Sequence, residues 1–80
     1  MFYVYLIKSL KFPDQKYIGY TDNLKERLET HNSGGSIYTR AYRPWKLVMF
    51  FGFAEKLKAT AFEKYLKSGA GRAFAKKRFW

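Results

Sequence analysis

The chain contains no cysteine and a single histidine, His31. Thiol catalysis, disulfide bonds and thiolate metal sites are therefore excluded, and one imidazole cannot build a zinc site unaided. Any metal ion needs oxygen ligands. Acidic residues are also few, six against sixteen lysines and arginines, which gives a formal net charge of +10. Such an excess suits a polyanionic partner, although ribosomal and architectural proteins share this composition.

Long apolar segments are missing as well. The apolar run Val48–Phe51 ends at Gly52 and is far shorter than the roughly 20 residues that a membrane span needs. The segment Met1–Ile7 carries no charge, so it lacks the basic start of a signal peptide. We expect a soluble, cytoplasmic protein that makes no membrane contact. The length predicts one domain, residues 1–80.

Aromatic residues, by contrast, are abundant. Eight Phe, seven Tyr and two Trp occur among 80 residues. A domain this short buries only about 60–65% of its unfolded surface, so its core must be efficient. Each large ring removes much apolar area from water, and the rings can supply that core.

Three apolar segments have the length and composition of β-strands. Alternation of side chains places Tyr5 on one face of the first strand, and a loop containing Pro13 leads into the second. If these two strands pair antiparallel, Tyr5 and Tyr17 can lie on the same face. The predicted strands are Phe2–Ile7, Lys16–Tyr20 and Trp45–Phe51, the first and third with apolar residues on both faces.

A helix is predicted to follow the second strand. Gly19 lets backbone or substrate approach the sheet closely, and Asn23 with Glu26 has the spacing of a capping box. On a helical wheel Arg27 and His31 are one turn apart and lie toward the apolar face, with Arg27 at its edge. We therefore expect both side chains to lie against the sheet. The segment Asn32–Ser36 ends this helix.

The rest of the chain predicts two more helices. A wide apolar arc predicts a helix over Ala54–Ser68, glycines interrupt it, and Arg72–Arg78 forms a short basic helix. The fold class is therefore α+β, a small three-stranded antiparallel sheet flanked by helices in the order β-β-α-β-α-α. The arc contains Leu57, Ala61, Phe62, Tyr65 and Leu66.

The spacing of a few residues resembles the GIY-YIG nuclease superfamily. Eleven residues separate Tyr3-Val4-Tyr5 from Tyr17-Ile18-Gly19, which is followed by an arginine on the next helix and a distant glutamate. More narrowly, the chain is similar to small single-domain members related to the N-terminal nuclease domain found in excinuclease ABC. The resemblance runs from Tyr3 to about Lys77, and the residues that carry it are Tyr5, Tyr17, Gly19, Arg27, His31 and Glu63.

This resemblance implies a role for each polar residue. Glu63 would hold one divalent cation, Mg²⁺ or Mn²⁺, because such ions accept a single carboxylate together with waters and phosphate oxygens. Tyr17 is the candidate general base, and Tyr5 orients the water or shares the proton. Arg27 contacts the scissile phosphate, and a hydrogen bond from His31 to Tyr17 or Tyr5 is expected. A phenol is only about 0.1% ionised at pH 7, so a neighbouring cation must favour the charged form.

Each of these residues also has a structural interpretation. Glu63 has the spacing of an ordinary surface pair with Lys67, worth about 0.2–0.5 kcal/mol. Both tyrosines can be core aromatics, Arg27 a solvated helix residue, and His31 a helix-end histidine whose polar atoms are simply satisfied. From the residues alone these alternatives stay open.

Basic residues elsewhere are candidates for contacts with nucleic acid, which the resemblance implies to be DNA. Arginines interleaved with tyrosines between residues 38 and 43 can bind phosphate and stack on bases. Each phosphate neutralised on duplex DNA steepens the log–log salt dependence of binding by about 0.9. The candidates are Arg40, Arg43, Lys46, Lys67, Arg72, Lys76 and Lys77, with Arg78 beside them.

Two positions depart from the family pattern. Tyr3 stands where the family often has glycine, and no asparagine follows Asn32, although many members have one about a dozen residues after the glutamate. That region is occupied here by Ala75 and its neighbours. The asparagine helps to order the site elsewhere, so these departures bear on activity.

The predicted function is a metal-dependent endonuclease that hydrolyses phosphodiester bonds in DNA, in repair or processing, without a small-molecule cofactor. One alternative is a nucleic-acid-binding module that uses the same basic and aromatic surface without catalysis. Another is a protein that acts only with a partner supplying specificity. Cleavage that chelators do not affect, or no cleavage on any tested substrate, would favour the binding module.

Overall fold

The computed structural model describes all residues, 1–80. It contains three strands, three α-helices and one short 3-10 helix, in the predicted order β-β-α-β-α-α, which confirms the predicted α+β class. The elements are β1 (Phe2–Ser9), β2 (Lys16–Thr21), α1 (Leu24–Ser33), η1 (Arg40–Tyr42), β3 (Trp45–Phe53), α2 (Lys56–Lys67) and α3 (Gly69–Arg78).

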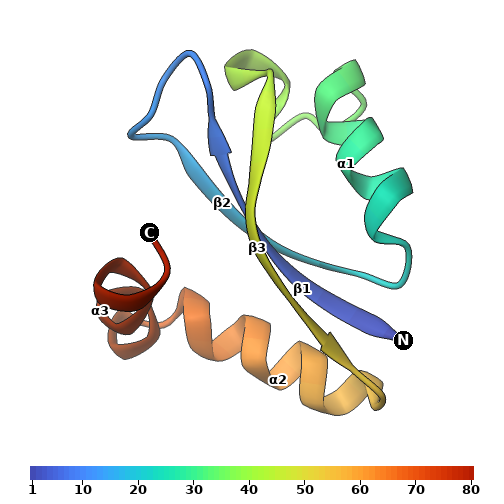
Figure 1. The fold of residues 1–80 in the computed structure, drawn as a ribbon, viewed down its shortest axis with the longest axis vertical. Coiled ribbons are helices and arrows are strands. Elements are labelled where there is room, and N and C mark those ends of the chain that lie inside the picture. The colour runs from blue at the N-terminus through green and yellow to red at the C-terminus, as the bar shows by residue number, and fades with distance from the viewer.

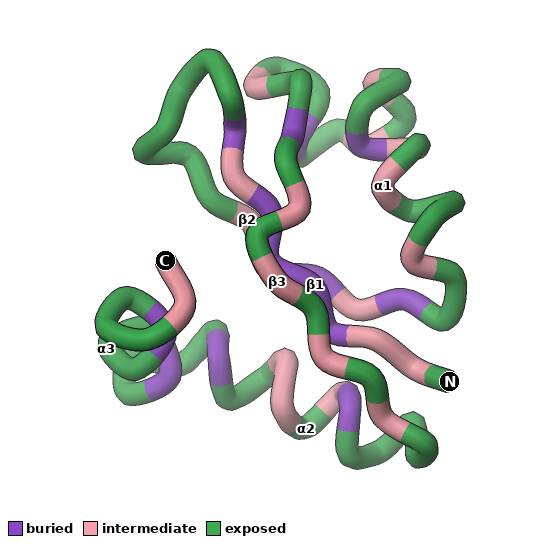
Figure 2. The backbone as a smooth tube through the Cα atoms, in the orientation of Figure 1, coloured by how far each residue is buried: buried purple, intermediate pink, exposed green.

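The three strands form one antiparallel sheet with β1 in the centre. The strand order is β2-β1-β3, and Tyr5 lies opposite Gly19 on one side and Phe50 on the other. Ile7 lies opposite Tyr17, so Tyr5 and Tyr17 share a face of the sheet, as predicted. The central strand is the most deeply buried element, because both its edges are paired and both its faces are covered (Figure 2).

Helices cover both faces of the sheet. Figure 1 shows α1 on one side and α2 with α3 on the other. Alternating side chains of β1 therefore enter two separate cores. Val4 and Leu6 pack with residues of α2 and α3, and Tyr5 and Ile7 pack with Trp45 under α1. No helix combines the length and the apolar character that crossing a membrane requires.

The start of α1 follows the predicted cap. The Asn23 side chain accepts a hydrogen bond from the backbone N–H of Glu26 (3.1 Å) and donates one to the Glu26 carboxylate (3.2 Å). These contacts satisfy one of the free N–H groups of the first turn. They fix the point at which α1 begins after β2.

Helix α2 packs with a different rotation from the one predicted. Leu57 is 82% exposed and Tyr65 is 43% exposed, although the apolar arc predicts that both are buried. Ala59 and Leu66 are buried instead, and Phe62 packs beside them. Leu57 precedes Ala59 by two positions, about 200° around a helix of 3.6 residues per turn, so burying Ala59 turns Leu57 to solvent.

Two further elements differ from prediction. The face of β3 that carries Val48 and Phe50 stays exposed, because the α1 layer packs over Trp45 and Leu47 at the other end of the strand. Helix α3 begins earlier than expected, at Gly69.

Tight packing explains the early start of α3. A side chain at Gly71 would collide with the backbone carbonyl of Tyr65, so glycine lets α3 pack directly against the end of α2. The Ser68 hydroxyl accepts a hydrogen bond from the Gly71 N–H (3.2 Å) and caps the helix. The predicted helix break is therefore a one-residue junction, and α3 reaches the β2 side of the molecule.

Candidate active site

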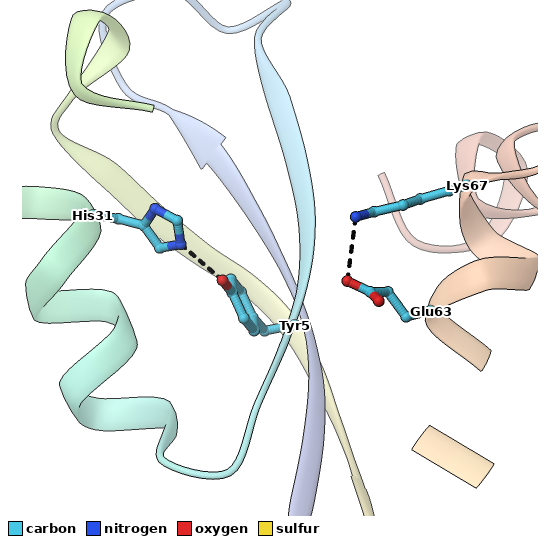
Figure 3. Close-up of polar contacts among 4 residues, drawn as sticks. All are labelled: Tyr5, His31, Glu63 and Lys67. Atoms are coloured by element: carbon cyan, nitrogen blue, oxygen red, sulfur yellow. Dashed lines mark hydrogen bonds and ion pairs between the residues drawn. The ribbon is translucent and has the colours of Figure 1, made fainter. Parts of the chain in front are cut away.

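A buried chain of hydrogen bonds connects β1 to α1 and the segment before η1. The Tyr5 hydroxyl and His31 Nε2 are 2.7 Å apart, and His31 Nδ1 lies 2.7 Å from the Thr39 hydroxyl. All three side chains are buried. Figure 3 shows Tyr5 and His31 pointing toward one another from β1 and α1. The predicted hydrogen bond of His31 to one of the two tyrosines is thus made to Tyr5.

Gly19 makes room for the Tyr5 ring. A side chain at Gly19 would collide with the Tyr5 hydroxyl and its ring carbon, so the ring lies directly over the backbone of β2. Gly19 was expected to let backbone or substrate approach the sheet closely. In the structure it is the Tyr5 side chain that makes this close approach. It holds the Tyr5 ring in one place against α1.

Burial dominates the ionisation of this pair. Burial raises the pKa of Tyr5 well above its usual range, Tyr17 and Glu63 nearby raise it further, and the Arg27 guanidinium lowers it. Burial also lowers the pKa of His31, and Arg27 adds to that shift. At neutral pH both groups are therefore uncharged, and their hydrogen bond joins a phenol to an imidazole.

The shifted pKa of His31 predicts how stability depends on pH. The pKa of a histidine is near 6.5 in the unfolded chain and lower in the folded one. As the pH falls below about 6.5 the unfolded chain takes up a proton first, so the free energy of unfolding decreases until the folded pKa is reached. Above pH 6.5 this contribution is constant. Urea unfolding between pH 8 and 5 measures it.

The single histidine makes this measurement specific. NMR titration of the His31 ring gives its folded pKa without an assignment problem, since there is no second histidine. In the variant His31→Gln the loss of stability between pH 6.5 and the folded pKa should be absent. A His31 that titrates above 6.5 in the folded protein would contradict the burial argument.

Tyr17 lies where the two helical layers meet. Its ring centroid is 5.2 Å from that of His31 on α1, and the Lys67 ammonium group on α2 lies 5.7 Å from the ring centroid. The ring is half-buried, and its hydroxyl makes no hydrogen bond within the chain. Tyr17 thus differs from Tyr5: its hydroxyl is free to meet a substrate or water, and a cation is close by.

Glu63 faces the same region from α2. Its carboxylate accepts a hydrogen bond from Lys67 Nζ at 3.2 Å, and its side chain is only 23% exposed. Figure 3 places this ion pair across the sheet from Tyr5 and His31. The surface pair considered from the sequence is therefore present, but Lys67 also lies over Tyr17. Lys67 therefore contacts both the Glu63 carboxylate and the Tyr17 ring.

Arg27 is more exposed than predicted. It borders a small hollow at the start of α1 with Thr21, Asn23 and Glu26. It lies one turn before His31, so it is on the same side of α1 as His31. Its positive charge lowers the pKa of both Tyr5 and His31. The guanidinium group is therefore near the buried pair while it stays open to solvent.

The candidate nucleic-acid contacts fall into separate groups. Lys67, Arg72 and Lys76 line one cleft beside Tyr17. Arg40 and Arg43 lie at η1 near the end of α1, and Lys46 borders a different hollow next to Lys8. Lys77, on α3, does not line this cleft. The expected basic surface is therefore concentrated at α2 and α3.

Several residues of this region were not predicted from the sequence. Thr39 gave no signal, because it lies in an irregular segment and its contact with His31 depends on the fold. Lys16 and Trp80 line the cleft beside Tyr17, with Lys16 Nζ 5.5 Å from the Trp80 ring centroid. Lys16 directly precedes Tyr17 in the sequence, and this adjacency is the one feature from which its place beside Tyr17 could have been predicted.

The charge and position of Glu63 fit a ligand for a metal ion. No group of three or more His, Cys, Asp or Glu side chains is close enough to hold an ion. The Glu63 carboxylate forms an ion pair with the Lys67 ammonium. The Glu63 carboxylate alone is compatible with an ion such as Mg²⁺, which keeps several waters and takes one or two carboxylates together with substrate phosphates.

Comparison with known proteins finds one matching family and several similar sequences. The sequence matches the family described as the GIY-YIG catalytic domain over residues 1–77. A UPF0213 protein of Clostridium perfringens is 43% identical over 68 residues, 84% of this chain and 71% of that protein. The structure-specific endonuclease subunit SLX1 of Malassezia globosa is 44% identical over 63 residues, 74% of this chain.

A solved structure supports the same relationship. The solution NMR structure of a UPF0213 protein from Bacillus halodurans has 31% sequence identity and a TM-score of 0.56, and the match covers 96% of this chain and 84% of that one. Lengths differ among the relatives: this chain spans 14% of the Malassezia protein. It spans 52% of a UPF0213 protein from Streptococcus pneumoniae.

Proposed function

Since the chain belongs to the GIY-YIG family, we propose that it is an endonuclease that hydrolyses phosphodiester bonds in DNA with a divalent metal ion. The observation that carries this proposal is the position of Tyr17, whose ring lies between His31 and the Lys67 ammonium. Lys67 is paired in turn with Glu63. A free phenol, a carboxylate and an exposed guanidinium are thus contributed by β2, α2 and α1.

Tyr17 is the general base in this mechanism. In its ionised, phenolate form it takes a proton from the attacking water, the water oxygen bonds to phosphorus, the bond to the 3′-oxygen breaks, and the leaving oxygen takes up a proton from solvent. The Arg27 guanidinium stabilises negative charge on the phosphoryl oxygens. Tyr5 remains protonated, because burial raises its pKa, and therefore orients the reacting groups rather than accepting a proton. His31 and Thr39 hold Tyr5 in place.

Glu63 holds the metal ion, Mg²⁺ or Mn²⁺, in this proposal. When bound, the ion supplies Lewis-acid stabilisation of the charge on the phosphate and the leaving oxygen. With an ion there, Lys67 would no longer pair with Glu63 and would be free to bind a phosphate of the substrate. The ion pair of Glu63 with the Lys67 ammonium supports the proposal that this carboxylate attracts a cation.

The proposal extends to DNA repair or processing and to a protein partner that supplies specificity. Its support is the similarity to the Malassezia protein, which is named as a subunit and of which this chain spans 14%. The high positive charge, +10, favours nucleic acid as the substrate.

Cleavage of labelled linear, branched and single-stranded DNA with Mg²⁺, Mn²⁺ or EDTA tests the proposed function. We expect cuts with either metal ion and none in EDTA, because the reaction needs the Lewis acid. Binding without cuts on every substrate would instead support a non-catalytic binding module. Cuts that persist in EDTA would remove the metal ion from the mechanism.

A further inference from the structure

A basic cleft lies beside Tyr17, between β2 and the end of the chain. Its volume is about 610 Å³, within the range of about 300–1,000 Å³ typical of pockets for small ligands. Four of the lining residues are cationic and one, Asp14, is acidic. The lining is completed by Tyr17, Ile18 and Trp80, and its cations are Lys16, Lys67, Arg72 and Lys76.

Trp80 provides an aromatic surface in this cleft. The residue is half-buried and packs against the core beneath α2 and α3, which supports the ring from behind. The Lys16 ammonium, which also lines the cleft, lies 5.5 Å from the ring centroid. A cation over an indole marks an accessible π face.

We propose that this cleft binds one unpaired nucleotide of a nucleic-acid strand, with its base stacked on Trp80. The flanking phosphates contact Lys67, Arg72 and Lys76. Stacking of bases on aromatic side chains within a positively charged groove is the general mode of single-strand recognition, and it tolerates any sequence. In an intact duplex both faces of each base are covered by neighbouring pairs, so only an unpaired or displaced nucleotide can reach Trp80.

This inference rests on the proposed function, and it names the class of substrate. Tyr17 and Lys67 border both the cleft and the candidate active site. A nucleotide stacked on Trp80 therefore lies next to the phosphate that Tyr17 would serve. The expected substrates contain a junction between paired and unpaired segments, such as flaps or frayed ends.

Tryptophan fluorescence in EDTA tests binding without catalysis. The chain has two tryptophans: Trp45 is 6% exposed, donates its indole N–H to the Thr39 carbonyl and lies outside the cleft. Quenching by a short strand therefore reports on Trp80. An oligothymidylate of about six nucleotides, a typical length for one binding site, should quench it. The same strand without bases, and a blunt duplex, should not.

Variants separate the base contact from the phosphate contacts. By anisotropy of a labelled strand, Trp80→Ala should bind several-fold more weakly, and Trp80→Phe should retain most of the affinity because it keeps a ring. Lys76→Gln should make the log–log salt dependence shallower by about 0.7. The control Lys25→Gln, on the solvent side of α1, should leave the salt dependence unchanged.

Two results would overturn the inference: quenching of Trp80 by the duplex as strong as by the oligothymidylate, or equal affinity for strands with and without bases. Because these measurements need no metal ion, an absence of cleavage does not affect them. Cleavage that is equally fast on blunt duplex and on flaps would refute the substrate preference while the proposed endonuclease activity stands. A ribonucleotide strand of the same length shows whether the cleft distinguishes RNA from DNA.

Discussion

Replacing Glu63 by glutamine is expected to lower the rate of DNA cleavage by on the order of a thousandfold or more. The amide keeps the size of the side chain and loses the negative charge that would hold the metal ion. The fold should be unaffected, because the ion pair with Lys67 is partly exposed and such pairs contribute about 0.2–0.5 kcal/mol. Affinity for DNA should be kept or slightly increased, since one acidic group is lost.

The chain offers a matched control at the start of α2. Glu55 also forms an ion pair there, with Lys58 at 3.4 Å, and both of these side chains are largely exposed. Glu55→Gln removes the same charge and the same kind of pair away from Tyr17, and cleavage should be unchanged. Single-turnover cleavage and DNA binding are measured for both variants. Full activity of Glu63→Gln would eliminate the one-carboxylate metal site.

Replacing Tyr17 by phenylalanine is expected to reduce the rate of the chemical step by about 10²–10⁴-fold, the usual contribution of a general base. The ring would keep its contacts with His31 and Lys67. Only the hydroxyl is removed, and it makes no hydrogen bond within the chain. Stability and DNA affinity should therefore stay close to those of the parent protein.

Two other tyrosines show whether the effect is specific. Tyr20→Phe removes a hydroxyl from the same strand on the opposite face, and cleavage should be unchanged. Tyr5→Phe leaves the buried Nε2 of His31 without a partner, which costs about 1–3 kcal/mol of stability. Tyr5→Phe should thus lose stability, and its loss of rate should be smaller than that of Tyr17→Phe, because Tyr5 orients the reacting groups and accepts no proton. If it instead lost more activity than Tyr17→Phe, the assignment of the base would be reversed.

Much of the fold could be predicted from local patterns. Alternation within β1 and β2 placed Tyr5 and Tyr17 on one face, and the cap at Asn23 fixed the start of α1. The rotation of α2 could not be predicted. Its arc of apolar residues is wide enough for several orientations, and contact with β1 selects the one that buries Ala59.

The candidate site was predictable only in part for a similar reason. His31 lies one turn from Arg27 on a short amphipathic helix, so its approach to a tyrosine of the sheet followed from spacing. The contact of Lys67 with Tyr17 joins residues far apart in the sequence and depends on how α2 packs against the sheet. Thr39 and Trp80 lie outside the strands and α-helices, where no periodic pattern indicates the direction of a side chain.

The structure also shows how the chain accommodates its departures from the family pattern. Tyr3 lies opposite Gly52 on β3, and its ring packs edge-on against Phe50 with centroids 5.9 Å apart. A side chain at Gly52 would meet the Tyr3 ring at ordinary contact distance, so it is the packing on Phe50 that accommodates the larger residue. Ala75 is fully buried and packs with Leu66. An asparagine there would place an amide in the apolar core, so α3 in this chain serves packing at that position.

The strand order has a consequence for the architecture of larger assemblies. The sheet has two edges, β2 and β3, and the backbone groups on an edge strand can pair with an added strand. Tyr17 and the Trp80 cleft lie along β2, so a strand added there would cover them. An added strand at β3 leaves them open. A fused module or a bound subunit that extends this sheet by a strand therefore leaves the cleft accessible when it pairs with β3, and closes it when it pairs with β2.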